Sequence, residues 1–149
     1  MRNRFIVCTM LALLALTPQS PADATAQGVN SGGHPFLIGG IGRDEAELLA
    51  SERSHFALTV RTAAAGSGAY LSDVHLSIRD AAGELVFDAT LDGPWLLIDL
   101  PPGRYVVAGV QDGQVQQREV TLQAGAHREC VLYFTVEGEL RPFHGDDTD

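Results

Sequence analysis

The sequence predicts an all-β domain in which two antiparallel sheets enclose one core. From residue 54 onwards, apolar residues recur at every second position, which is the period of a half-buried strand. Turn residues such as Gly, Pro and Asp separate these alternating stretches at intervals of about 8–12 residues. About seven such stretches lie within residues 54–137, and that number is typical of an antiparallel sandwich.

The N-terminal residues 1–26 have the parts of a cleaved signal peptide. Two arginines precede an apolar stretch over residues 5–16, which is too short to anchor a chain in a bilayer. Small residues at Ala24 and Ala26 then suit signal peptidase, with cleavage after Ala26 expected and cleavage after Ala24 as the alternative. We therefore expect a periplasmic or secreted protein with no membrane span after processing.

The composition of the mature chain limits its functions. Removing residues 1–26 from the 149 leaves 123, with 8 arginines against 18 carboxylates, a net charge of −10. This charge repels nucleic acid, so none is expected as a partner. The chain contains no lysine, which excludes Schiff-base chemistry and a phosphate-loop lysine. The one remaining cysteine, Cys130, alternates with Leu132 and Phe134 and is expected to be buried.

Residues 27–53 are expected to precede the sandwich. The glycine-rich stretch 27–42 predicts a flexible or irregular lead-in, and residues 44–53 predict a short helix capped by Asp44. Leu48 and Leu49 form an apolar patch on this helix. We expect the patch to cover the sandwich, with an interface to another molecule as the alternative.

Turn chemistry predicts two hairpins within the sandwich. One turn runs from Asp80 to Gly83, and the other is the dipeptide Asp112-Gly113. Residues 95–100 are apolar on both faces, which predicts a strand covered on both sides. A change of apolar parity after Val115 predicts a β-bulge near Gln117. The strands are expected over residues 55–61, 73–79, 84–91, 95–100, 105–111, 114–122 and 128–136, followed by an acidic tail over 138–149.

Short motifs within this region carry a family resemblance. An aromatic residue and leucines follow Asp92-Gly93, and a Pro-Gly turn then leads to a tyrosine; the residues are Asp92, Gly93, Trp95, Leu100, Pro102, Gly103 and Tyr105. In these residues the chain resembles the carboxypeptidase regulatory-like domains, a prealbumin-like (transthyretin-like) β-sandwich family. The resemblance implies a Greek-key order of seven antiparallel strands. It also implies that Trp95, Leu100 and Tyr105 fill the core beside the Pro-Pro-Gly corner.

The sequence favours a protein that is not an enzyme. Hydroxyisourate hydrolases share the prealbumin-like fold but end in a Tyr-Arg-Gly-Ser motif, which residues 140–144 lack. No acid–base pair stands at a meaningful spacing, and no cofactor is expected. Trp95 and Tyr105 are candidates for stacking on carbohydrate, but the family register places both in the core. Tyr70 and Tyr133 are less constrained, and Tyr133, which has outward parity on the last strand, is expected to be the better exposed of the two.

Histidines offer the main alternative to a pure interaction module. His55 and His75 have outward parity on strands that are candidates for neighbours, so their rings are low-ranking candidates for a transition-metal site. The expected function is a non-catalytic exported module that binds a protein or cell-envelope component. The alternative is a periplasmic protein that binds a metal or small ligand through surface histidines, of which the chain has His34, His55, His75, His127 and His144.

Overall fold

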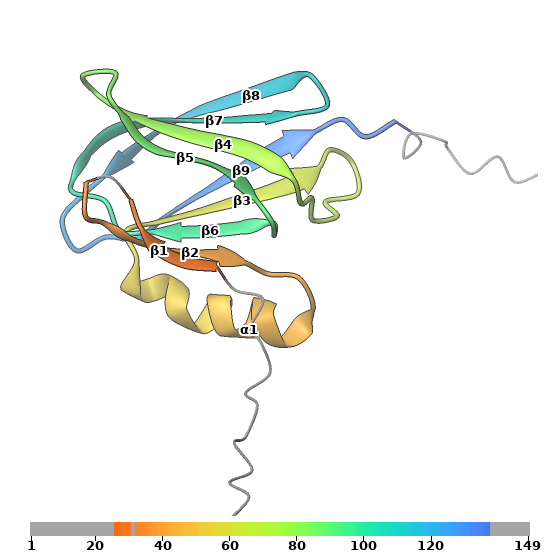
Figure 1. The fold of residues 1–149 in the computed structure, drawn as a ribbon, viewed down its shortest axis with the longest axis horizontal. Helices are drawn as coiled ribbons and strands as arrows, with labels where there is room; N and C mark the ends of the chain where they lie inside the picture. Colours follow the sequence, from red (N-terminus) through yellow and green to blue (C-terminus); the bar gives the residue numbers. More distant parts are fainter. Residues whose placement is uncertain (1–25, 31, 138–149) are drawn as a thin grey trace, which may run out of the picture.

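In the computed structural model, which describes residues 26–30 and 32–137, two β-sheets pack face to face and one helix lies outside them (Figure 1). One sheet has five strands in the order β1-β2-β6-β3-β9, and the other has four in the order β5-β4-β7-β8. The strands are β1 (Ala26–Val29), β2 (Pro35–Gly39), β3 (Leu58–Ala64), β4 (Val74–Asp80), β5 (Leu85–Leu91), β6 (Trp95–Ile98), β7 (Gly103–Gln111), β8 (Gln114–Leu122) and β9 (Arg128–Phe134).

The predicted period of two places the core between the sheets. Alternate residues of β3, β4, β7 and β9 point inward, so that apolar side chains from both sheets meet. Cys130 is 5% exposed in this core, which confirms its predicted burial, and that burial raises the pKa of its thiol. The core consists of Ile38, Leu58, Val60, Val74, Leu76, Ile78, Phe87, Leu91, Leu96, Ile98, Leu100, Tyr105, Val107, Leu122, Cys130, Leu132 and Phe134.

Strand β6 is covered on both sides, as the sequence predicts. Leu96 and Ile98 point into the core between the sheets. Trp95 and Leu97 point the other way and pack against Leu49 of helix α1 (Arg43–Glu52). Leu49 therefore covers the sheet as predicted, whereas Leu48 of the same patch is 45% exposed. Figure 1 shows α1 along the outer face of the five-stranded sheet.

The helix begins one residue earlier than predicted and is capped differently. Gly42 occupies the N-cap position and makes no side-chain cap, so the expectation that Asp44 caps the helix is wrong. Instead, the Glu45 carboxylate accepts a hydrogen bond of 2.8 Å from the backbone N–H of Ile41, which satisfies one of the free donors at this end. A 3₁₀ turn, η1 (Arg53–His55), follows the helix.

The glycine-rich lead-in is not irregular, and this corrects the strand count. It forms the hairpin β1–β2, and β2 pairs with β6, so the described residues contain nine strands rather than seven. Apolar side chains hold the hairpin in place, since Ile38 is buried in the core and the Phe36 ring meets Phe87 of the other sheet edge-on at 5.3 Å. In the sequence, glycines and turn-forming residues surround this short apolar stretch, so its strand pattern is hard to recognise.

Two further expectations about pairing are wrong. The sheets are not wholly antiparallel, because β3 and β9 pair in parallel over their full length. The bulge predicted near Gln117 is absent, since β7 and β8 pair residue for residue from Gly103 to Gln111. Val115 is simply 63% exposed, so the change of parity reflects an apolar residue facing solvent. A register shift does occur, but between Ile78 and Arg79 of β4.

The residues that carry the family resemblance have distinct structural roles. Leu100 and Tyr105 lie in the main core, and the Tyr105 hydroxyl donates a 2.7 Å hydrogen bond to the Pro101 carbonyl at the corner. Trp95 is buried as well, but beneath α1 rather than beside that corner. The predicted signal peptide lies outside the described residues except for Ala26, which begins β1, and the acidic tail lies outside them entirely. Among the residues that are described, no helix is long and apolar enough to cross a membrane.

Gly93 allows the lead-in hairpin to dock. A Cβ built at this position would lie 2.3 Å from the carbonyl oxygen of Gly39, which is backbone and cannot rotate away. The turn before β6 and the end of β2 therefore touch backbone to backbone. Glycine is required here for close approach rather than for a positive φ.

Replacing Gly93 with alanine tests this contact. We expect Gly93→Ala to lower the free energy of unfolding by about 3 kcal/mol, because β2 must move away from β6. Gly113→Ala is the control, since its Cβ meets open space and only its φ of +78° is strained, at about 1 kcal/mol. Urea unfolding measures both variants, and equal losses would contradict the close docking of β2.

Candidate functional site

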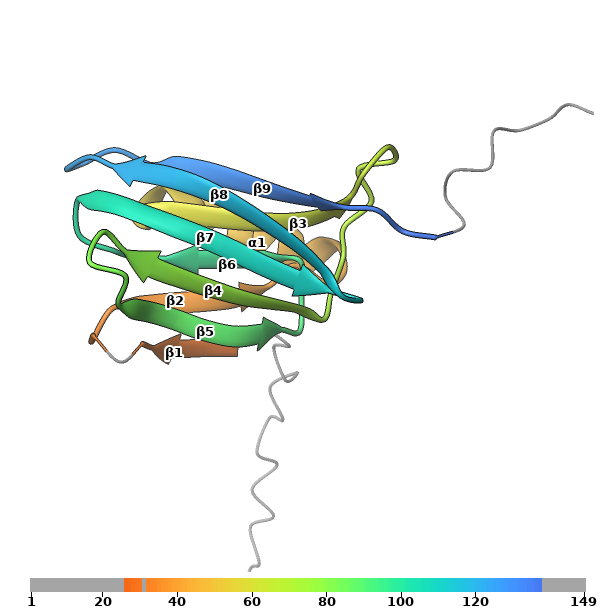
Figure 2. The same cartoon turned by 90° about the horizontal axis from the view of Figure 1, so that it is seen from above.

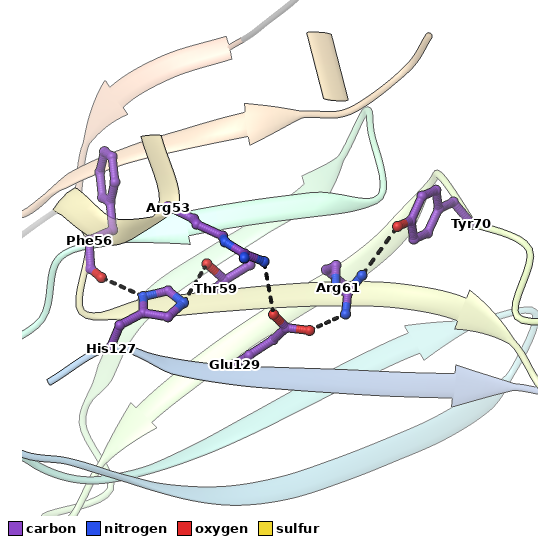
Figure 3. Close-up of polar contacts among 7 residues, drawn as sticks. All are labelled: Arg53, Phe56, Thr59, Arg61, Tyr70, His127 and Glu129. Atoms are coloured by element: carbon purple, nitrogen blue, oxygen red, sulfur yellow. Dashed lines mark hydrogen bonds and ion pairs between the residues drawn. The ribbon is translucent and has the colours of Figure 1, made fainter. Parts of the chain in front are cut away.

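The outer face of the five-stranded sheet carries a group of arginine and tyrosine side chains beside the helix. Helix α1 packs over β2 and β6, whereas side chains of β3 and β9 reach solvent. We call this surface the β3–β9 face and define it by Arg53, Arg61, Tyr70, Glu129 and Tyr133 (Figure 3 shows the first four). Its residues come from four different parts of the chain, so only the folded protein assembles it.

The parallel register of β3 and β9 places these residues together. Thr59 lies opposite Glu129, and Ala63 lies opposite Tyr133. The neighbours at even positions point into the core, so residues at odd positions of both strands point outward. Tyr133 is 47% exposed there, which agrees with its outward parity, but Tyr70 is 50% exposed, so the expectation that Tyr133 is the better exposed of the two is wrong.

Glu129 holds two arginines on this surface. Its carboxylate forms an ion pair with the Arg61 guanidinium and lies 3.8 Å from Arg53 at the end of the helical segment (Figure 3). The Arg61 and Glu129 side chains are only 26% and 31% exposed. Partial burial reduces solvent screening, so this pair contributes more than an ion pair in open solvent.

Arg61 is also fixed by aromatic neighbours. It donates a 3.2 Å hydrogen bond to the Tyr70 hydroxyl, and its guanidinium carbon lies 5.4 Å from the centre of the Trp95 ring. Tyr70 meets the same ring edge-on at 6.1 Å. These contacts hold the guanidinium in one position on the sheet.

The arrangement keeps Arg61 positively charged. Burial lowers the pKa of Arg61, but hydrogen bonds to Tyr70 and Glu129 outweigh that effect and leave the pKa above its ordinary value. Among the described residues, Arg61 Nε and the indole N–H of Trp95 are buried donors with no acceptor.

A histidine-lined cavity adjoins the β3–β9 face. It has a volume of about 560 Å³, and His34, His55, His127 and Asp99 are among its lining residues. His127 Nδ1 lies 2.8 Å from the Phe56 carbonyl oxygen, to which it donates. Its Nε2 lies 3.4 Å from the Thr59 hydroxyl and accepts from it in this arrangement (Figure 3). Both ring nitrogens of His127 are therefore already engaged.

The two predicted metal-site histidines lie apart. His55 is in η1, where Nδ1 is 3.2 Å from Glu52, whereas His75 is on β4 of the other sheet, with Nε2 2.7 Å from Asp88. The expectation that they occupy neighbouring strands is wrong, because β3 pairs with β6 and β9 and not with β4. Within residues 26–30 and 32–137, no three His, Cys, Asp or Glu side chains are placed to hold a metal ion.

Sequence reasoning missed the residues of the β3–β9 face, apart from Tyr133. One signal was present, because Arg61 and Glu129 are charged residues within strands whose other members are largely apolar. No protein-family profile matches the chain, and no curated protein matches it. The geometry and charge of the face are therefore the basis for a proposal about function.

Neutralising Glu129 tests how the arginines are held. Glu129→Gln is expected to lower the free energy of unfolding by about 1–2 kcal/mol, since it leaves Arg61 partly buried without its counter-charge. The control is Glu119→Gln, which removes the cross-strand partner of the exposed Arg104. This control is expected to leave stability unchanged in urea unfolding. A Glu129→Gln variant as stable as its control would show that the network does not hold the face together.

Proposed function

We propose that this chain is a non-catalytic exported module that binds a protein or another cell-envelope component through the β3–β9 face. The observation that carries the proposal is a partly exposed set of arginine and tyrosine side chains held in place by Glu129 and Trp95. Arginine and aromatic residues are enriched at protein interfaces and supply most binding hot spots. Side chains fixed before binding also lose less entropy when a partner arrives.

Two potential nucleophiles, Tyr105 and Cys130, have pKa values shifted away from reactivity. Burial raises the pKa of Tyr105 and of Cys130, so both stay protonated at neutral pH. Arg61 and Arg104 have a raised pKa and stay charged. A cysteine or tyrosine nucleophile needs a lowered pKa instead, so neither Tyr105 nor Cys130 is activated as one.

We further propose that the sandwich is a member of the carboxypeptidase regulatory-like, prealbumin-like group with Greek-key connections. The roles of the motif residues support this. Tyr105 closes the Pro-Pro-Gly corner through its bond to Pro101, and Leu100 fills the core beside it. The β1–β2 hairpin and helix α1 are additions from the lead-in, which has no counterpart recognised in that family.

A histidine-based function is the second candidate. The histidine-lined cavity supports this function, because His34, His55 and His127 line it together with Asp99. Both ring nitrogens of His127 already have partners, at 2.8 Å and 3.4 Å, which favours a small organic ligand over a metal ion. The cavity adjoins the β3–β9 face, so a ligand there would lie next to a bound partner.

Export is tested by the mass of the mature protein. Full-length protein expressed in a bacterium with a general secretion pathway is expected to appear in the periplasm or medium, starting at Gln27. Intact-mass spectrometry distinguishes this product from one that starts at Thr25. Retention of the full 149 residues in the cytoplasm would contradict an exported module.

Binding is tested by changing one exposed side chain on each sheet: Tyr133 on β9 and Val115 on β8. The processed protein is immobilised and exposed to detergent-solubilised envelope extract, and the retained components are quantified. Tyr133→Ser is expected to reduce saturable retention about tenfold, as loss of an interface aromatic residue does. Val115→Ser, at a similarly exposed position on β8 of the other sheet, is expected to retain as much as the wild type. Equal retention by both variants, or none by any, would contradict the proposal.

A further inference from the structure

One edge of the sandwich lies open, away from the β3–β9 face. The four edge strands are β1 and β9 of one sheet and β5 and β8 of the other. Strands β8 and β9 contact each other, and the Gln114 side chain accepts from the backbone N–H of Thr135 and donates to its carbonyl. Strand β1 has only four residues. The seven-residue strand β5 therefore remains as the longest edge without such protection.

The backbone of β5 presents hydrogen-bonding groups at this edge. The Leu91 carbonyl faces β4 and accepts from the N–H of Asp73 at 2.8 Å. The Val86 carbonyl faces away from β4 and accepts from the Asn30 side chain at 2.7 Å. The pairing with β4 is regular from Phe87 to Leu91, and backbone groups alternate in direction along a regular strand, so Thr90 and Asp88 point their N–H and C=O groups away from β4, opposite to Leu91.

An apolar groove runs beside these groups. It has a volume of about 320 Å³ and lies between β5 and the end of β1, which are edge strands of different sheets at the same side of the sandwich (Figure 2). Val29 and Leu85, 62% and 40% exposed, are among its lining residues, and Phe36 and Phe87 also line it. An added strand at β5 would place alternate side chains into this groove.

The charge of the edge selects the kind of strand that fits. Glu84, Asp88 and Asp92 are exposed along β5 and its two ends, and the stretch from 84 to 92 contains no arginine or lysine. His75 of β4 lies 2.7 Å from the Asp88 carboxylate, which leaves Glu84 and Asp92 as the main charges at the edge. A second copy of the chain would bring Asp88 towards its own counterpart, and like charges directly opposite each other are destabilising. The net charge of −9 opposes self-association as well. A basic partner is favoured on both grounds.

We propose that the free edge of β5 binds an extended peptide segment of a partner protein in which apolar residues alternate with lysine or arginine. The backbone of that segment pairs with Asp88 and Thr90. Its apolar side chains enter the groove by Val29 and Leu85, and its basic side chains face the carboxylates. This site is independent of the β3–β9 face, so either one can fail without the other.

The probe for this site is a labelled ten-residue peptide in which valine and lysine alternate. It is compared with a peptide of the same composition whose valines and lysines form two separate blocks. The alternating peptide is expected to bind the processed protein at least tenfold more tightly and to slow amide hydrogen exchange in residues 84–92. Equal affinity of the two peptides, or protection elsewhere, would overturn the proposal, because either result indicates general attraction to an acidic surface.

Variants of the edge complete the test. Thr90→Pro removes an outward N–H and blocks pairing with an added strand. An edge strand tolerates proline at such a position. With this variant, the peptide is expected no longer to slow hydrogen exchange in residues 84–92. If circular dichroism shows that Thr90→Pro is unfolded, Leu85→Ser with Asp88→Asn decides instead, with an expected loss of at least tenfold in affinity. Val115→Ser is the control and is expected to bind normally. Normal binding by the edge variants, or dimerisation through β5 in sedimentation, would refute the proposal.

Discussion

Strand β6 is buried on both of its faces, and this double burial determines where the other elements lie. Its four residues are all buried, two against the core and two against helix α1. Each large apolar side chain contributes about 1.5–3 kcal/mol when it leaves water, so β6 contributes more per residue than a half-buried strand. It is the central strand of its sheet, with β2 on one side and β3 on the other. The helix, the lead-in hairpin and the β3–β9 face all depend on this position.

The same constraint connects the fold to the candidate site. Trp95 is held under α1 and offers its ring to Arg61, while Glu129 from the parallel neighbour of β3 holds the same guanidinium. Parallel pairing puts Arg61 and Glu129, which are 68 residues apart in sequence, on one surface. The contacts leave the Arg61 and Glu129 side chains little freedom to move. A surface held in this way loses less entropy when it binds a partner.

The parts that the sequence predicts are those with a local physical signal. Alternating residues reveal β4 and β9, continuous apolar residues reveal the double burial of β6, and Asp112-Gly113 reveals a hairpin. The hairpin β1–β2 escapes this reasoning, because five residues ending in Gly39 show too little periodicity. The pairing of β3 with β9 also escapes it, since a period of two does not say which strands are neighbours. For the same reason, the sequence does not show that His55 and His75 lie on separate parts of the fold. It also does not show that Arg61 and Glu129 lie side by side.

Native-state amide hydrogen exchange of the processed protein tests the central role of β6 most directly. If β6 lies at the centre of the larger sheet between two apolar layers, the amides of Leu96, Leu97 and Ile98 exchange only through global unfolding and are among the slowest in the chain. Exchange of these amides at rates close to those of β1 or the exposed turns would contradict the account, because β6 would then be a peripheral strand.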